Sequence, residues 1–414
     1  MSCIPFLRTV GSSPLNLKRQ TVPKTLSLCL AAAVSLSLFV GCEGGPPTFK
    51  QLTGQDGDEK KNAEKPKAPK KPAAKSAEKT QDQVAAVTKK KPRSRPKNDD
   101  ESKDGTKSKP AGKALQIDDI DAFVDEFNET GGPIKTDEEL ESLILGLGDD
   151  VDRIETLVLR GSTVSDDGMQ TVPTFSNLRD LDVASTQFSS PGWEAVSKIK
   201  DLEIINVSNT SITDDDLVHL SEFPRLLSLN IGNCKKITDL GMAENLGELR
   251  ELEELIMNAN KTLTGAGFTA IRKRKGLSNL QFLEASNTAF GTQGLVGCQS
   301  LRDLEVLILG NCTIRDPAMV GLKYCKNLVR IEMGYNGALT DVGMLAFKEF
   351  KLFKLEHLDL HNCGGITDVG VQTLRKYKNL KYLNLDGTKV SVKVGKAIKK
   401  QFPDVQVIVG GREI

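Results

Sequence analysis

The residue types best suited to chemistry lie within one short stretch, His357-x-Asp359-x-His361. If this stretch is a β-strand, all three side chains point to the same side and offer imidazole and carboxylate groups to a metal ion. Glu332 and Asp386 would lie on the neighbouring strands. His357 and His361 would be roughly 13 Å apart, however, which is too far for both to bind one ion. We therefore predict no metal site and no cofactor, and a metal-dependent hydrolase remains an alternative that bound zinc would support.

The rest of the sequence offers little support for an enzyme. The 414 residues include three histidines. We find no phosphate-binding glycine-rich loop with its lysine, no paired Cys-x-x-Cys motif and no nucleophile elbow. The prediction is therefore a non-enzymatic protein.

The histidines belong to a repeating unit of a short strand, a turn and a helix, which residues 355–377 show most clearly. Leu355, Leu358 and Leu360 alternate as in a strand, and after a turn at Cys363 the apolar residues recur at helical spacing. The first leucine position recurs every 24 to 28 residues, at Ile154, Leu178, Leu202, Leu226, Leu252, Leu280, Leu304, Leu328, Leu355 and Leu380. One strand and one helix cannot bury their apolar faces alone, so the copies must stack into a solenoid.

Each copy also has a small hydrogen-bonding residue three positions after the last apolar residue of its strand. This column reads Ser162, Thr186, Thr210, Cys234, Asn260, Thr288, Cys312, Asn336, Cys363 and Thr388. In a stacked solenoid, these side chains would bond to backbone amides of neighbouring turns that would otherwise be buried without partners. Glycine recurs near the helix starts, which indicates close helix packing, at Gly168, Gly192, Gly241, Gly267, Gly294, Gly343 and Gly370.

The column of Thr, Cys and Asn, with the phrase Thr-Asp-x-Gly at Thr238, Thr340 and Thr367, resembles the cysteine-containing leucine-rich repeats of F-box proteins and many bacterial proteins. The resemblance covers residues 154 to about 402. It implies an α/β fold: a leucine-rich-repeat solenoid, or horseshoe, with a parallel β-sheet on the concave face and helices on the convex face. It also implies that the domain binds other proteins.

The concave face of such a sheet is the candidate binding surface, because alternate strand residues point outward there. Those residues are a mixture of acids, amides and a few apolar side chains, which suits a protein or peptide partner that carries basic groups. We predict that the partner-binding residues are Glu284, Arg330, Glu332, His357, Asp359, His361 and Tyr382.

Residues 1–41 have the pattern of an export signal, because four lysines and arginines precede an uncharged apolar run that ends at Cys42. The sequence from Phe39 to Cys42 resembles the lipobox of bacterial lipoproteins, although Phe39 stands where leucine is usual. That resemblance implies that Cys42 is diacylated and that the chain is an exported, membrane-anchored lipoprotein of the bacterial cell envelope. An ordinary signal peptide and an uncleaved anchor remain alternatives.

Residues 42–113 are predicted to be the lipidated Cys42 followed by a disordered tether rich in lysine, proline and alanine. From residue 43 to 113 the chain holds 19 Lys and Arg against 11 Asp and Glu. Aromatic residues do not interleave with these charges, so nucleic acid is not an expected partner. A structural cell-envelope protein that acts through its basic tether is a second alternative function.

Residues 114–150 are predicted to form an N-terminal helical cap, with helices over 117–127 and 137–145. Residues 151–414 are the predicted leucine-rich-repeat domain, with a closing strand over 405–409. From residue 114 to the end, the chain holds 33 Lys and Arg against 44 Asp and Glu, so this part is acidic.

Two questions stay open at this point. Cys298 and Cys325 are the only pair of repeat cysteines whose spacing permits a disulfide, and the sequence does not decide whether they are paired. An F-box-like ubiquitin-ligase substrate adaptor is a third alternative function, suggested only by the repeat subtype. The export signal and the absence of a recognisable F-box helical module before Ile154 argue against it.

Overall fold

The structure is a computed structural model that describes residues 114–414 except Pro133 and Lys275. The predicted signal peptide, the lipidation of Cys42 and the disordered tether all lie outside the described residues. They therefore stay predictions.

The strands form one open twelve-stranded sheet in which each strand pairs with the next along the chain. Strands β1 to β11 pair in parallel, and the last two strands pair antiparallel. The strands are β1 Thr156–Val158, β2 Asp180–Asp182, β3 Ile204–Asn206, β4 Ser228–Asn230, β5 Glu254–Ile256, β6 Phe282–Glu284, β7 Val306–Ile308, β8 Arg330–Glu332, β9 His357–Asp359, β10 Tyr382–Asn384, β11 Gln406–Val409 and β12 Arg412–Glu413.

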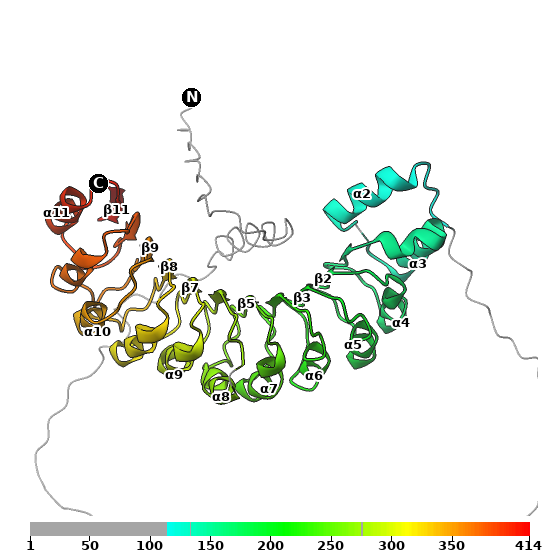
Figure 1. The fold of residues 1–414 in the computed structure, drawn as a ribbon, viewed down its shortest axis with the longest axis horizontal. Helices are drawn as coiled ribbons and strands as arrows, with labels where there is room; N and C mark the ends of the chain where they lie inside the picture. Colours follow the sequence, from blue (N-terminus) through cyan, green and yellow to red (C-terminus); the bar gives the residue numbers. More distant parts are fainter. Residues whose placement is uncertain (1–113, 133, 275) are drawn as a thin grey trace, which may run out of the picture. The chain divides into compact units, whose positions relative to one another are not determined.

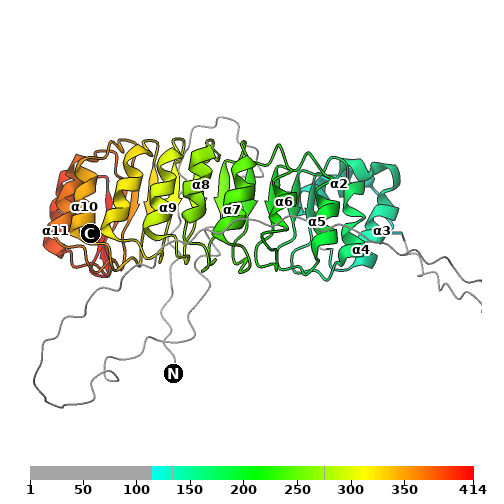
Figure 2. The ribbon, with the colours of Figure 1, turned by 90° about the horizontal axis from the view of Figure 1, so that it is seen from below.

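Helices cover the opposite side of the solenoid, so the strands line its concave face and the helices its convex face (Figures 1 and 2). The α-helices are α2 Ile120–Thr130, α3 Asp137–Leu147, α4 Asp166–Met169, α5 Ser190–Val196, α6 Leu217–Leu220, α7 Asp239–Asn245, α8 Ala266–Arg274, α9 Gly291–Gly297, α10 Asp341–Leu345 and α11 Val392–Gln401. The 3₁₀ helices are η1 Gly148–Arg153, η2 Val172–Thr174, η3 Leu246–Glu248, η4 Cys298–Ser300, η5 Asp316–Tyr324, η6 Ala346–Lys348 and η7 Gly370–Lys376. The predicted solenoid architecture is therefore confirmed.

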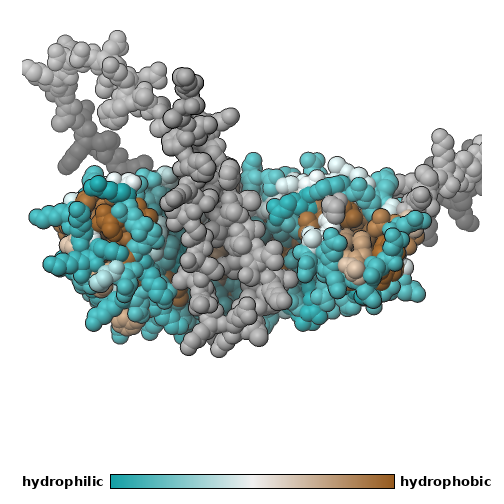
Figure 3. Space-filling model, turned by 90° about the horizontal axis from the view of Figure 1, so that it is seen from above, coloured by the Kyte–Doolittle hydropathy of each residue, from teal (hydrophilic) through white to brown (hydrophobic). Residues whose placement is uncertain are grey.

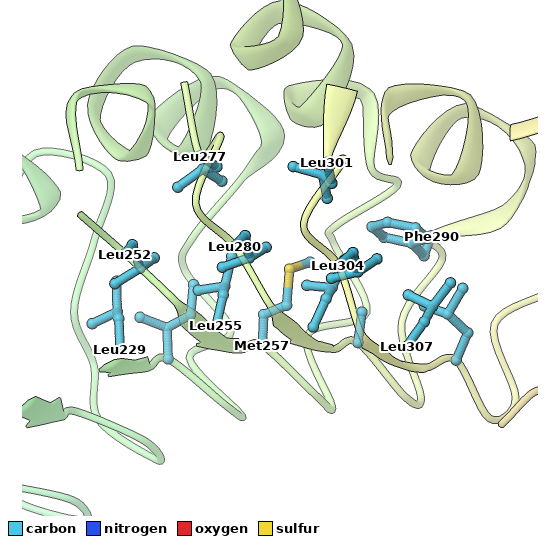
Figure 4. Packing of buried hydrophobic residues seen from close by; sticks show 14 of the residues in the cluster. Leu229, Leu252, Leu255, Met257, Leu277, Leu280, Phe290, Leu301, Leu304 and Leu307 are labelled. Atoms are coloured by element: carbon cyan, nitrogen blue, oxygen red, sulfur yellow. The ribbon is translucent and has the colours of Figure 1, made fainter. Parts of the chain in front are cut away.

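The core consists of rows of apolar side chains that run from coil to coil between the sheet and the helices. The middle residue of each strand from β1 to β10 is fully buried, as Leu229, Leu255 and Leu307 illustrate. Figure 4 shows these three residues beside a second row formed by the first leucine position of the repeat. Because each buried leucine contributes roughly 1.5–3 kcal/mol, the coils stabilise one another and no coil has a core of its own.

The column of small polar residues lies in the turns after the strands and joins each coil to its neighbour. The Cys312 thiol donates to the Ala285 carbonyl of the preceding turn at 2.9 Å, and the Asn260 side chain donates to the Ile231 carbonyl at 2.8 Å. The predicted bonds to backbone amides also occur, since Asn336 Oδ1 accepts from the backbone amide of Cys312 at 3.0 Å. Carbonyl oxygens are thus partners that the prediction did not include.

The Thr-Asp-x-Gly phrase forms a second ladder, on the convex side. The Asp341 carboxylate accepts from both the backbone amide and the hydroxyl of Thr367 in the next coil, at 2.8 and 2.6 Å. The same arrangement joins Asp214 to Thr238 and Asp316 to Thr340. A Cβ added at Gly370 would lie 2.3 Å from Asp341 Oδ1. Gly370 therefore makes room for a carboxylate of the preceding coil, as do Gly241 beside Asp214 and Gly343 beside Asp316, a role that helix packing alone does not explain.

Capping elements close both ends of the solenoid. Before β1, the helix α2 runs from Ile120 to Thr130 between its N-cap Asp119 and its C-cap Gly131, three residues later at each end than the sequence indicated. The Gly131 carbonyl accepts from the Val158 amide at 2.9 Å, so this segment covers the free edge of β1. At the far end, β11 includes most of the expected closing strand, and the sequence did not reveal β12 beyond it. No helix in the described part of the chain is long and apolar enough to span a bilayer.

Candidate functional site

Six of the seven predicted binding residues lie together on β8, β9 and β10 or directly after β9. The register aligns Arg330 of β8 with His357 of β9 and Tyr382 of β10, and it aligns Glu332 with Asp359. We call the side chains of Arg330, Glu332, Tyr335, His357, His361 and Tyr382 the β8–β10 surface. On the visible concave side, hydrophilic residues surround a smaller hydrophobic area at each end of the solenoid (Figure 3).

An ion pair and a ring stack organise one half of the β8–β10 surface. The Arg330 guanidinium contacts the Glu332 carboxylate, with Nε 2.7 Å from Oε1. His357 Nε2 lies 3.3 Å from the same oxygen without a well-aligned hydrogen bond. Burial opposes ionisation of Glu332, but His357 and Arg330 together hold the pKa of this carboxyl below its usual value. Glu332 therefore stays ionised at neutral pH.

The His357 ring lies flat on the Tyr382 ring of the next strand, with centroids 4.1 Å apart. The two rings project from adjacent strands whose backbones are paired by ladder hydrogen bonds. A preformed stack of this kind presents a large flat area at little further cost in side-chain entropy.

Asp359 has a structural role that the sequence prediction did not assign. It is 9% exposed and accepts from the backbone amide and Nδ1 of His361, at 2.8 and 2.6 Å. Asn384 of β10 donates to its other carboxylate oxygen at 3.1 Å. In other coils the side-chain oxygen at the equivalent position likewise accepts from the backbone amide two residues later. These residues are Asp182, Asn206, Asn230 and Asn384. Asp359 therefore shapes the turn and orients His361.

The Asp359 carboxylate also raises the pKa of His361 above its usual value, through the hydrogen bond that it accepts. The imidazole lies over Gly334, where an added Cβ would be 2.2 Å from Cε1. Any side chain at position 334 of the preceding coil would clash with the His361 ring in this position.

Tyr335 is a member of this surface that the sequence prediction missed. Its side chain is 60% exposed, and its ring meets the His361 ring edge to face with centroids 4.7 Å apart. Its backbone is left-handed, with φ of 59°. The equivalent left-handed residues in the other coils are small or are asparagine: Gly161, Ser185, Asn209, Asn233, Ala259, Asn287, Asn311, Asn362 and Gly387. The signal in the sequence was this single aromatic residue in a column of small and amide residues.

Glu284 lies apart from the other six predicted residues. It is on β6, and β7 separates it from β8. It is 2% exposed and its Oε1 accepts from Asn258 at 3.3 Å, which differs from the solvent-facing carboxylate that we expected. Ile256 and Ile308 flank it in the sheet register, and burial raises its pKa to about 7. A role for Glu284 in partner binding stays a prediction.

The described residues contain no group of three or more His, Cys, Asp and Glu side chains placed to hold a metal ion. His357 faces Glu332 while His361 faces Asp359, so the two imidazoles serve different carboxylates. The thiols of Cys298 and Cys325 are buried and free, and Cys325 Sγ donates to the Cys298 carbonyl at 3.3 Å. That contact answers the question of pairing left open by the sequence.

Residues 351–374 match the family described as Leucine Rich repeat. The fold is a leucine-rich-repeat solenoid. An internalin from Listeria monocytogenes is 18% identical, with 69% of this chain and 86% of that chain covered and a TM-score of 0.46. Internalin C2 from the same species is 22% identical over 51% and 83% of the two chains, with a TM-score of 0.41.

A third similar structure is the complex of Rad7 and Elc1 from yeast. The matched chain is 18% identical, with 70% of this chain and 87% of that chain covered and a TM-score of 0.40. The function has to be argued from the β8–β10 surface itself.

Proposed function

We propose that this leucine-rich-repeat protein is non-enzymatic and binds a protein or peptide partner through the β8–β10 surface. The observation that carries the proposal is the exposed, left-handed Tyr335 beside His361, next to the stacked rings of His357 and Tyr382. Tyrosine and arginine are the residue types that most often dominate protein interfaces.

The conformation of Tyr335 strengthens this reading. A left-handed backbone at a large residue costs on the order of 1–2 kcal/mol, and asparagine or glycine would avoid much of that cost. The other coils use such residues at this turn. A tyrosine that is both strained and exposed contributes little to the fold, so we attribute its presence to contact with a partner.

The charges of the surface favour a partner with basic groups. The charge of Arg330 is balanced by its ion pair with Glu332. In the turn after β10, the Asp386 carboxylate adds a negative charge, and its Oδ1 accepts from the Gly411 amide. The described residues belong to the acidic part of the chain, with 33 Lys and Arg against 44 Asp and Glu from residue 114 onward. Such a field speeds the approach of a cationic partner.

We also propose that the chain is exported and anchored to a membrane of the bacterial cell envelope by lipid on Cys42. The support is the sequence of residues 1–42, in which a cationic lead, an apolar run and a cysteine follow one another. Metabolic labelling with a radioactive fatty acid should label the native protein and leave a Cys42→Ser variant unlabelled. Equal labelling of both would remove the anchor from the proposal.

The binding proposal is tested by quantitative capture of partners from detergent-solubilised membranes. The variant Tyr335→Asn/Tyr382→Ala removes two aromatic side chains of the surface. The matched control Leu240→Ala/Val342→Ala removes two exposed apolar side chains from the convex side. We expect the same proteins to be captured by the native chain and the control and to be lost with the first variant. Equal capture by both variants, each with a native melting temperature, would contradict the proposal.

A further inference from the structure

A pocket of about 540 Å³ lies where three successive coils return from their helices to the sheet, on a different part of the solenoid from the β8–β10 surface. Its polar lining comes from the end of α8, the turn after it, η4 and the end of η5. The lining side chains with hydrogen-bonding groups are Arg272, Ser278, Gln299, Ser300, Arg302 and Tyr324. The volume is within the range of pockets that hold small molecules.

The pocket is basic although residues 114–414 are acidic as a whole. The step from Leu252 to Leu280 is 28 residues, four more than the shortest steps, and α8 is the longest α-helix from α4 to α10. The extra length ends in the run Arg272-Lys-Arg-Lys275. The insertion in this repeat therefore ends in a basic run, of which Arg272 lines the pocket.

The two arginines of the pocket have no carboxylate partner among the residues that the structure describes. By contrast, Arg225 two coils earlier pairs with Asp201 at 3.1 Å and with Glu203 at 3.3 Å. Arg272 is instead oriented by a hydrogen bond from Nη1 to Gln299 Oε1 at 2.9 Å. No other hydrogen bond of the Arg272 guanidinium, and none of the Arg302 guanidinium, is made to the residues that the structure describes. A guanidinium offers five N–H groups, so both have donors for an anion.

The geometry points to a site for the phosphate group of a small phosphorylated ligand. We infer that Arg272 and Arg302 bind the phosphate oxygens. The hydroxyls of Ser278 and Ser300 line the same pocket, and their present hydrogen bonds, to Asn279 Oδ1 and the Gly297 carbonyl, are long at 3.5 and 3.4 Å. The Tyr324 ring, which is 48% exposed, forms a wall for the organic part of the ligand. Phosphate esters in solution and anionic lipid headgroups both carry this group.

The site is tested by calorimetric titration of the purified full chain with glycerol 3-phosphate at constant ionic strength. A parallel arm measures co-sedimentation with phosphatidylglycerol vesicles, with phosphatidylcholine vesicles as the blank. The variant Arg272→Gln/Arg302→Gln should weaken binding at least about tenfold, since each arginine loses charged hydrogen bonds. Binding of the soluble ester identifies a free ligand, and binding of vesicles alone identifies a lipid headgroup.

The control Arg225→Gln/Arg250→Gln removes the same charge from arginines that pair with carboxylates elsewhere. We expect it to change the affinity by less than twofold. An equal loss in both variants would show that net charge alone binds the anion, and absence of binding to either probe would also overturn the proposal. If the double variant melts at a lower temperature than the native chain, the single variant Arg302→Gln replaces it in the binding test. The Arg302 side chain makes no hydrogen bond within the described residues, so this change should leave the fold intact.

Discussion

The imidazole of His357 and the phenol ring of Tyr382 lie on adjacent strands with their planes 6° from parallel and their centroids 4.1 Å apart. The parallel register places the two residues directly opposite each other, so the stack is a consequence of the strand pairing. Glu332 lies on the other side of His357. Strands β8, β9 and β10 thus hold a carboxylate, an imidazole and a phenol in contact across three coils, before any partner binds.

The left-handed backbone of Tyr335 predicts opposite effects of one substitution on stability and on binding. Tyr335→Asn should raise the free energy of unfolding by roughly 0.5–1 kcal/mol, because asparagine tolerates this conformation better. The same change should reduce partner capture, because the exposed ring is lost. Urea denaturation and quantitative capture measure the two effects. A variant that is less stable than the native chain would show that the Tyr335 ring is needed by the fold.

The bonds of Asp359 predict a difference between two substitutions of the same residue. Asp359→Ala should lower the free energy of unfolding by about 1–3 kcal/mol, because the His361 amide and the Asn384 side chain lose their acceptor. Asp359→Asn keeps an oxygen acceptor and should cost less than half as much. If chemical denaturation showed an equal loss in the free energy of unfolding for both variants, the role of Asp359 as the acceptor in this turn would be contradicted.

The raised pKa of His361 predicts how stability changes with pH. The folded protein holds the imidazole proton more tightly than the unfolded chain, whose histidine pKa is about 6.5. The stabilising contribution is therefore complete below pH of about 6.5 and is lost as the pH rises through the folded pKa of His361. An NMR titration of the imidazole should give a pKa above 6.5, and His361→Gln should flatten the decline of the denaturation midpoint above that pH. A pKa at or below 6.5 would refute the pairing with Asp359.

The ladder on the convex side predicts that an alanine will destabilise one helical turn. Gly370→Ala should lower the free energy of unfolding by about 1–3 kcal/mol, because the new Cβ would lie 2.3 Å from Asp341 Oδ1. Intrinsic helix propensity alone would favour alanine over glycine by about 1 kcal/mol, so the sign of the change is informative. Val369→Ala, at the exposed neighbouring position, is the control and should change stability by less than about 0.5 kcal/mol.

The solenoid could be predicted because its signals repeat. Ten leucine or isoleucine positions and a column of small polar residues agree with one another, and stacking of the coils is the arrangement that satisfies both. The ends were harder, since α2 and β12 each occur once. The sequence offered no second copy from which to check the boundaries of these elements.

The candidate site could be predicted only in part, because the same residue types serve two purposes on the concave face. Period-two alternation correctly brought Arg330, His357 and Tyr382 into one row. It did not distinguish Asp359, which shapes a turn, from Glu332, which pairs with a cation. Tyr335 was missed because it lies in a turn, where the left-handed conformation that makes it unusual appears only in the structure.

The central claim is that a partner lies against the β8–β10 surface, and site-specific photo-crosslinking tests it most directly. The crosslinking residue p-benzoylphenylalanine would replace Tyr335 or Tyr382 on the concave side, and Val342 on the convex side as the control. After irradiation in intact cells, we expect one crosslinked product of the same mass from both concave positions and none from position 342. Crosslinking from position 342 alone would contradict the claim and place the binding surface on the helices.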